Sequence, residues 1–299
     1  MLAHHKSVQV VLTVLGAGLI CFAAAAAPNT EKQEEHHFTV KDHPVVIIDN
    51  IVNGRIEVKS WKNSEVVVSS TFVPGKVSID SEQVGDRIDI NATSLVNTSS
   101  EPHEVEANFQ LMVPEQTELR LRTQTGLILV EQVIGDMKLQ SVAGDVHLKE
   151  VSGYIIVKTT GGSLVCTLCS GRLEFNSISG SAQILQPALS NLNAMTTTGN
   201  ILYDGDFVRT GLYTMNSGRG LVEVRFSGTD SFDLNAQTFN GTVDNEAADF
   251  LKPDSHGKHH ASQASQSKFS HSLFGTVGQG FAKVELSSYS GTIRILKRD

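Results

Sequence analysis

The chain of 299 residues has few aromatic and few charged side chains. Aromatic residues make up 6% of the sequence and charged residues 19%, and the charged share lies below the roughly one quarter that is usual in soluble domains. Glycine, serine, threonine and valine are frequent instead. This composition suits a repetitive scaffold of short β-strands and argues against a helical protein.

Basic residues are outnumbered by acidic ones, which argues against one class of partner. The chain has 24 Lys and Arg against 32 Asp and Glu, for a formal net charge of −8. A protein that binds nucleic acid needs a basic stripe to neutralise phosphates. We therefore predict no nucleic-acid partner.

The common catalytic motifs are absent from the sequence. There is no G-x-S-x-G nucleophile turn, no H-E-x-x-H zinc motif and no G-x-x-x-x-G-K phosphate loop. Asp136 and Asp145 each follow a glycine, but calcium-binding nonapeptides need G-G-x-G-x-D in stacked register. We predict no catalytic, cofactor-binding or metal-binding residues, no cofactor, and a protein that is not an enzyme.

Cysteine is also scarce. Cys21 lies near the N-terminus, and the other two cysteines form a single C-x-x-C motif, Cys166 and Cys169. A structural zinc site usually needs a second ligand pair, so zinc is not expected. Both cysteines fall on inward positions of a repeat, where we expect two small buried core residues. A disulfide remains the alternative in an oxidising compartment.

Only one long apolar run occurs, and it lies at the N-terminus. Residues 8–22 are apolar and residues 23–27 are all alanine, a pattern typical of a secretory signal peptide. The run is short for a membrane span, and Ile20 before Cys21 argues against lipid attachment. We expect a signal peptide at 1–26, no membrane span in the mature chain, and export to the periplasm, cell surface or medium. Polar residues 27–37 are expected to be a disordered tail.

A fixed glycine period dominates the middle of the chain. Glycine recurs every nine residues, at Gly126, Gly135, Gly144, Gly153, Gly162, Gly171 and Gly180. A constant period of this kind indicates a repeat architecture. Apolar residues alternate after each glycine, as in Gly144, Val146 and Leu148, which is the period of a β-strand.

Two nonapeptides make one coil of about 18 residues, marked by a Ser or Thr three residues before a Gly. Stacked coils can bury apolar faces that one unit cannot. We therefore predict an all-β parallel β-solenoid (β-helix) with coils of about 18–20 residues, in preference to an antiparallel sandwich. Six residues should stack in columns inside it: Ile128, Leu139, Val146, Leu148, Leu173 and Phe175.

One domain, 38–299, is expected. Its divisions are irregular N-terminal strands at 38–120, with loops at 74–86 and 97–104; regular repeats at 121–246; a long loop at 247–280; and final strands at 281–299. The long loop contains His256, His259, His260 and His271. Histidine clusters can bind metals, but a solvated loop is the preferred interpretation because no rigid helix presents these residues.

Outward positions of the repeat carry mixed charges, predicted to be a solvated surface. They include Asp136, Lys138, Asp145, His147, Lys149, Arg172 and Glu174. The nearest approach to a catalytic group is Asp204 and Asp206 beside Tyr203, with Arg209 nearby. A polysaccharide-active enzyme would need such converging carboxylates. The sequence Asp204-Gly205-Asp206 is more typical of a turn.

Three segments together resemble the bacterial putative-adhesin family of β-strand-repeat domains of unknown function. They are residues 53–61, the step from residues 111–114 into the turn at Gly126, and residues 278–295. The resemblance covers residues 40–297 and implies a right-handed β-solenoid, export, and a scaffold or adhesive role without catalytic residues. The partner is unknown. An envelope protein, paired through an exposed strand edge, and a surface glycan are the two candidates.

Overall fold

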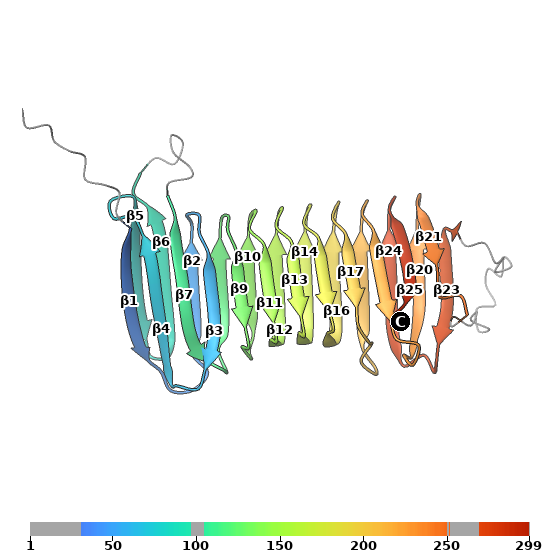
Figure 1. Cartoon of the computed structure of the whole chain (residues 1–299), viewed down its shortest axis with the longest axis horizontal. Helices are drawn as coiled ribbons and strands as arrows, with labels where there is room; N and C mark the ends of the chain where they lie inside the picture. The colour runs from blue at the N-terminus through green and yellow to red at the C-terminus, as the bar shows by residue number, and fades with distance from the viewer. Residues whose placement is uncertain (1–30, 97–104, 250, 252–268, 299) are drawn as a thin grey trace, which may run out of the picture.

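The computed structural model describes residues 31–96, 105–249, 251 and 269–298. Regular structure in these residues consists of 25 β-strands in two large sheets that face one another along a long stack (Figure 1). The predicted signal peptide and three of the four loop histidines, His256, His259 and His260, lie outside the described residues. No helix in the described part of the chain is long and apolar enough to cross a membrane.

Sheet A has thirteen strands. In spatial order they are β1 (Lys32–Thr39), β4 (Glu65–Phe72), β7 (Ala107–Pro114), β3 (Ile56–Trp61), β9 (Ile128–Glu131), β11 (Val146–Lys149), β13 (Leu164–Thr167), β15 (Ala182–Leu185), β17 (Ile201–Asp204), β19 (Val222–Phe226), β25 (Thr292–Lys297), β21 (Thr242–Asn245) and β22 (Phe269–Ser270).

Sheet B has twelve strands. In spatial order they are β23 (Ser272–Val277), β20 (Phe232–Thr238), β24 (Ala282–Ser288), β18 (Leu212–Ser217), β16 (Ala188–Thr196), β14 (Ser170–Ser177), β12 (Ser152–Thr159), β10 (Met137–Ser141), β8 (Glu118–Thr123), β2 (Val45–Asn50), β6 (Arg87–Ser94) and β5 (Val77–Val84).

From β8 to β19 the chain crosses from one sheet to the other after every strand. Each strand from β8 to β17 pairs in parallel with the strand two elements later, so that Val146 is aligned with Ile128 on one side and Leu164 on the other. This is the predicted 18-residue spacing. Parallel pairing throughout these strands excludes the antiparallel sandwich.

The spacing then lengthens after Gly180. Ala182 is aligned with Ile201, and Ile201 with Val222. A register shift at Gly171 and Arg172 accommodates one extra residue in β16. Near the C-terminus the spatial order departs from the chain order, because β24 lies between β18 and β20, and β25 between β19 and β21.

The core lies between the two sheets. Along β11, Val146 and Leu148 are buried while His147 is half-buried and Lys149 exposed, because successive strand residues point to opposite faces. All six residues predicted to stack in columns are at most 2% exposed, and Leu139, Val157 and Phe175 are aligned across β10, β12 and β14. The inward column prediction is therefore confirmed.

At the corner that follows six strands of sheet B (β10, β12, β14, β16, β18 and β24), a side-chain hydroxyl accepts a hydrogen bond from the turn. The Gly162 N–H donates to Thr159 Oγ1 at 2.8 Å, and the Thr196 hydroxyl donates to the Gly180 carbonyl of the preceding coil at 2.9 Å. The same glycine N–H to hydroxyl bond recurs at Ser141–Gly144, Ser177–Gly180, Thr196–Gly199, Ser217–Gly220 and Ser288–Gly291. This explains the Ser/Thr-x-x-Gly period in the sequence.

At the opposite corner the backbone turns through a left-handed residue that is not glycine. Gln132, Glu150, Leu168 and Gln186 have φ of 59°, 55°, 56° and 48°. Their N–H groups donate to the next coil, as Leu168 does to the Leu185 carbonyl at 3.0 Å. Pairing between coils holds these residues in a conformation that L side chains seldom adopt.

Three predicted boundaries are wrong. The expected disordered tail at 27–37 overlaps β1, which pairs antiparallel with β4 and buries Phe38. The expected loop at 74–86 contains β5, which pairs with β6 at the edge of sheet B. The expected loop at 247–280 contains β22 and β23, which pair antiparallel with β21 and β20. Edge strands need little apolar alternation. The polar sequences of these three segments therefore did not indicate strands.

Candidate functional site

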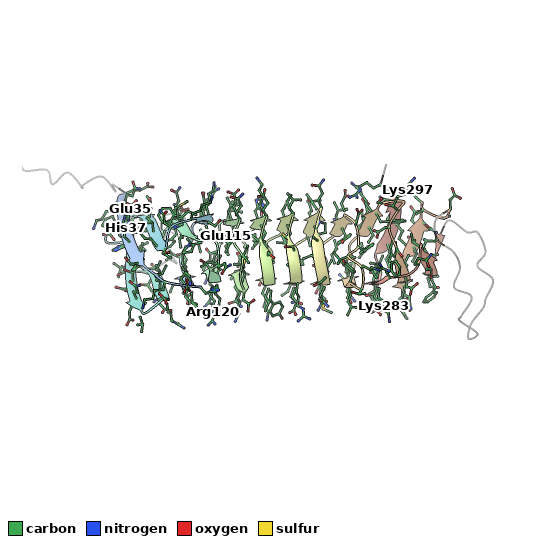
Figure 2. All side chains as sticks on the ribbon, turned by 90° about the horizontal axis from the view of Figure 1, so that it is seen from below. Glu35, His37, Glu115, Arg120, Lys283 and Lys297 are labelled. Atoms are coloured by element: carbon green, nitrogen blue, oxygen red, sulfur yellow. A yellow bond between two sulfur atoms is a disulfide. The ribbon has the colours of Figure 1, made fainter. Side chains whose placement is uncertain are left out.

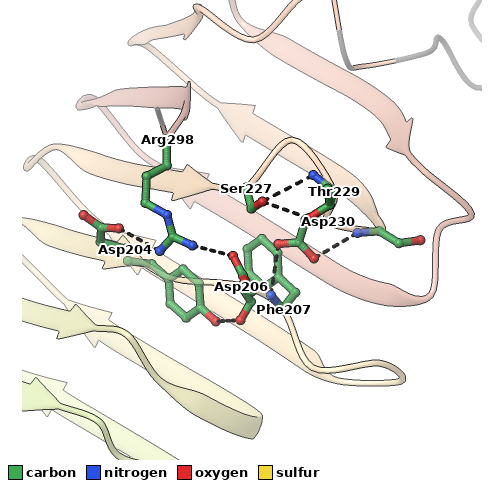
Figure 3. A network of polar contacts seen from close by, with 9 residues as sticks. Asp204, Asp206, Phe207, Ser227, Thr229, Asp230 and Arg298 are labelled. Carbon is green, nitrogen blue, oxygen red and sulfur yellow. Dashed lines mark hydrogen bonds and ion pairs between the residues drawn. The ribbon is translucent and has the colours of Figure 1, made fainter.

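The structure brings the two predicted carboxylates, Asp204 and Asp206, to one cation at the C-terminal end of the chain. Arg298 Nη2 lies 2.6 Å from Asp206 Oδ1, and Arg298 Nη1 lies 3.4 Å from Asp204 Oδ1 (Figure 3). Arg209, the cation expected from the sequence, instead places its guanidinium 3.7 Å from the centre of the Phe281 ring. The two carboxylates are therefore part of an ion-pair cluster that secures the C-terminal strand β25.

Tyr203, the third member of that candidate site, points into the core. Its hydroxyl donates to the Asp206 carbonyl at 2.9 Å, and its ring stacks on Phe207 at 4.8 Å. Burial raises the pKa of the Tyr203 phenol far above its usual value, so the group stays protonated. The Tyr213 hydroxyl donates to the Leu189 carbonyl at 2.5 Å, and burial raises the pKa of that phenol too. Both tyrosines fix loop geometry.

Asp230 connects two loops beside this cluster. Its carboxylate accepts the Phe207 N–H at 3.0 Å and the Ser231 N–H at 2.9 Å. Burial raises the pKa of Asp230, and these two hydrogen bonds oppose that effect. Asp230 has no distinctive signal in the sequence, because a single acidic residue in a polar turn is common. These two hydrogen bonds hold the loop that contains Phe207 against the turn that contains Asp230 and Ser231.

The two cysteines are buried, as predicted, and they are joined as a Cys166–Cys169 disulfide. The preferred interpretation of two unbonded core residues is therefore wrong. Their Cα atoms lie 6.0 Å apart, within the range that a disulfide spans, because they lie on either side of the left-handed residue Leu168. The tight turn, which sequence analysis did not anticipate, brings them together.

Neither group of residues weighed as a metal site converges on one in the described part of the chain. Asp145 Oδ1 accepts the Ser163 N–H at 2.7 Å, which joins two coils. His271 is exposed, between β22 and β23, and its carbonyl accepts the Thr238 N–H at 2.8 Å. Within the described ranges, no three or more His, Cys, Asp or Glu side chains are placed to hold a metal ion.

A shallow groove lies on the outer surface of sheet B, where β8, β10 and β12 reach the corner. Its volume is about 270 Å³. Cationic, amide, hydroxyl and one aliphatic side chain line it: Arg122, Thr123, Gln140, Ser141, Val142, Lys158, Thr159 and Thr160. The parallel register aligns Arg122, Gln140 and Lys158 in one row across three strands.

A second row beside it adds two cations, because Arg120 is aligned with Lys138. We call Arg120, Arg122, Lys138 and Lys158 the basic face; Figure 2 shows Arg120 projecting outward from its sheet. Arg120 Nη2 lies 2.7 Å from Glu118, and Arg122 Nη1 lies 3.6 Å from Asp49. Within the described residues neither Lys138 nor Lys158 makes an ion pair. Lys138 and Lys158 are therefore available to a ligand, and so is Arg122, because its side chain is 53% exposed and a guanidinium has further N–H donors beside the nitrogen that faces Asp49.

The row that contains Arg122 has no carboxylate from β8 to the C-terminal edge of sheet B. After Lys158 it continues with amide, hydroxyl and thioether side chains: Asn176, Met195, Asn216, Ser287, Gln237 and Ser272. Acidic residues outnumber basic ones in the whole chain. An acid-free row of this length can hydrogen-bond a neutral or anionic ligand without repelling it.

The basic face is not evident from the sequence when all outward residues are treated as one surface. Lys138 and Arg172 lie on sheet B, whereas His147 and Lys149 lie on sheet A. Successive nonapeptides belong to different sheets. Grouping their outward residues together therefore combines the charges of two separate surfaces. Sorting the outward positions by alternate units would have placed Arg122, Gln140 and Lys158 in one row, since they are 18 residues apart.

No protein-family model matches the chain, and no curated protein matches it. Solved structures do align with nearly the whole chain at low identity. A putative adhesin from Bacteroides fragilis is 8% identical, with 90% of this chain and 99% of that chain covered and a TM-score of 0.43. A putative cell adhesion protein from Clostridium sporogenes is 12% identical, covering 89% and 100%, with a TM-score of 0.30.

A third solved structure carries a different description. The putative lipid binding protein from Parabacteroides distasonis is 11% identical, with 89% of this chain and 97% of that chain covered and a TM-score of 0.34.

Proposed function

We propose that the chain is an exported, non-enzymatic β-solenoid that binds another component of the cell envelope through side chains on its outer faces. Strands that alternate between two parallel sheets support a solenoid, because each 18-residue coil returns to the same register. A right-handed coil is the hand expected for connections between parallel strands. A crystal structure of the chain would check that hand.

Export is supported by the Cys166–Cys169 disulfide, since disulfides persist mainly in oxidising compartments. The apolar N-terminal run supports it independently. Fractionation of cells that express the full chain should recover it from the periplasm, surface or medium. Recovery from the cytoplasm at its full length would contradict export.

A binding role is supported by the basic face above all. Lys138 and Lys158 lie without ion-pair partners, among the described residues, beside a groove lined by amide and hydroxyl groups. By contrast, the carboxylates that an enzyme would need, Asp204 and Asp206, are bound to Arg298. The outer surface thus offers recognition groups, while the acidic pair has a structural partner.

The test measures binding and turnover in the same samples. The exported chain is applied to an array of envelope polysaccharides and, in parallel, crosslinked in living cells to capture protein partners. Release of new reducing ends is followed for each polysaccharide. We expect binding without cleavage, and the same result for Asp204→Asn and Asp206→Asn. Cleavage that is lost in either variant would favour the polysaccharide-active enzyme instead.

A further inference from the structure

We propose that the basic face binds an acidic polysaccharide, a chain of sugars that carries carboxylates at regular intervals. The polysaccharide lies across β8, β10 and β12 in the groove, parallel to the long axis of the stack. This inference rests on the proposed function and specifies the ligand class of the same surface.

The spacing of the cations matches the spacing of carboxylates along such a polymer. Arg122 and Lys158 are two strands apart in one aligned row, which places their backbones about 10 Å apart at the usual strand spacing. An extended disaccharide has a comparable length. Carboxylates on alternate sugars can therefore meet Arg122 and Lys158, with Gln140 between them to bond a sugar hydroxyl.

The groove offers the remaining contacts that a sugar needs. Val142 is 46% exposed and presents an apolar surface, against which the C–H face of a sugar ring can pack. Thr160 lies beside it at the corner and can exchange hydrogen bonds with ring hydroxyls. Lys138, aligned between Arg120 and Ile156, adds positive charge on the opposite side of the row.

The same groups discriminate against a nucleic acid. Proteins that bind single strands stack bases on aromatic side chains, and none of the eight residues that line the groove is aromatic. Tyr154, on β12, donates its hydroxyl to Glu174 at 2.7 Å, so a carboxylate lies beside that ring. The groove therefore provides cations and hydroxyls without a stacking platform.

The experiment compares two polymers with the same sugar backbone, in which the carboxylates are either charged or neutralised as methyl esters. Polygalacturonate and its fully methyl-esterified form are titrated into the full exported chain by calorimetry at low and physiological salt. We expect binding of polygalacturonate that weakens with salt, and little binding of the ester. The double variant Arg122→Gln/Lys158→Gln should bind about tenfold more weakly, since each exposed ion pair contributes a few-fold.

A matched variant controls for net charge. Arg55→Gln/Lys59→Gln removes the same two charges at and beside β3 of sheet A, and it should leave the affinity within twofold. Thermal unfolding verifies that both double variants fold. Equal binding of the two polymers, or equal affinity of the two double variants, would overturn the proposal.

Two further outcomes separate this inference from the proposed function. Tighter binding of a DNA oligonucleotide or of phosphatidylglycerol vesicles, lost in Arg122→Gln/Lys158→Gln, would assign the face to another polyanion and overturn the polysaccharide. Absence of polygalacturonate binding, together with capture of a different envelope component on the array or by crosslinking, would overturn this inference alone. Absence of any partner would overturn both.

Discussion

Gly162 lies directly against Gly144 of the preceding coil, so closely that a Cβ on Gly162 would lie 1.9 Å from the Gly144 carbonyl oxygen. The same contact repeats at each turn of this corner. A Cβ on Gly180 would lie 1.8 Å from the Gly162 oxygen, and one on Gly199 would lie 2.0 Å from the Gly180 oxygen. The periodic glycines are therefore required by the distance between stacked backbones.

Gly162→Ala should destabilise the stack strongly. The added methyl group overlaps backbone atoms of Gly144 that cannot move without separating two coils. We expect a loss of about 3 kcal/mol or more in the free energy of unfolding, at the upper end of single substitutions. Denaturation by urea, followed by circular dichroism, would measure it.

Gly161→Ala is the matched control, one residue earlier in the same turn. A Cβ there would meet nothing closer than the Ser179 Oγ at 3.7 Å, which is ordinary contact. Its effect should stay within about 0.5 kcal/mol. Similar losses in the two variants would show that the backbone contact does not determine the glycine period.

The repeating part of the fold was predictable because two constraints recur at every coil. Glycine meets backbone at the corner, and alternate residues such as Val146 and Leu148 face the core. The edge strands β1 and β5 obey neither constraint. β1 has the sequence KQEEHHFT, with one buried residue, Phe38. Its pairing with β4 depends on backbone groups, and backbone pairing requires no particular side chains.

The candidate sites were less predictable, because contacts between distant coils determine them. Arg298 contacts Asp204 and Asp206 because β25 inserts beside β19. No periodicity in the sequence predicts that β25 lies next to β19. Cys166 and Cys169 are drawn together by the turn at Leu168. The basic face follows from an 18-residue register that the sequence does contain, and it emerges once the two sheets are separated.

Leu168→Asn should stabilise the protein. Leu168 has φ of 56° and its side chain is 45% exposed, so little packing compensates for the strained backbone. Asparagine adopts this left-handed conformation more readily than leucine does. We expect a gain of about 0.5 kcal/mol in the free energy of unfolding, measured by urea denaturation.

Thr167→Asn, one residue earlier, should have the opposite sign. Thr167 is the last residue of β13, where a β-branched residue is favoured and asparagine is not. A loss of about 0.5 kcal/mol is expected there. Destabilisation by Leu168→Asn as well would indicate that the leucine side chain contributes more than the strain costs.

The attachment of β1 should depend on pH through His37. Its ring nitrogens lie 2.9 Å from Glu35 and 2.9 Å from Glu65 of β4. The hydrogen bonds to Glu35 first, and then to Glu65, raise the pKa of His37 above its usual 6.5. The stabilisation is therefore fully present below the unfolded pKa, and it is lost as pH rises through the folded pKa.

Nuclear magnetic resonance titration of the histidine rings would measure this effect. We expect a His37 pKa above 6.5, and a lower value in Glu65→Gln because one acceptor carboxylate is removed. Glu82→Gln on the exposed strand β5 removes an equal charge away from the pair and should leave the titration unchanged. A His37 pKa that is the same in Glu65→Gln would refute the ion-pair model.

Asp230→Ala should destabilise the protein more than Asp206→Ala, although Asp206 was one of the two carboxylates considered for catalysis. Removal of the Asp230 carboxylate leaves the N–H groups of Phe207 and Ser231 without their acceptor. Loss of the acceptor for two part-buried donors costs about 2 kcal/mol. Asp206→Ala, at a side chain that is 62% exposed, removes only the ion pair with Arg298, and such pairs contribute at most about 1 kcal/mol.

Asp230→Asn, which keeps one acceptor oxygen, should have a free energy of unfolding between those of Asp230→Ala and Asp206→Ala in urea denaturation. If Asp206→Ala proved the more costly, the C-terminal ion-pair cluster would have to hold the loops in place of Asp230.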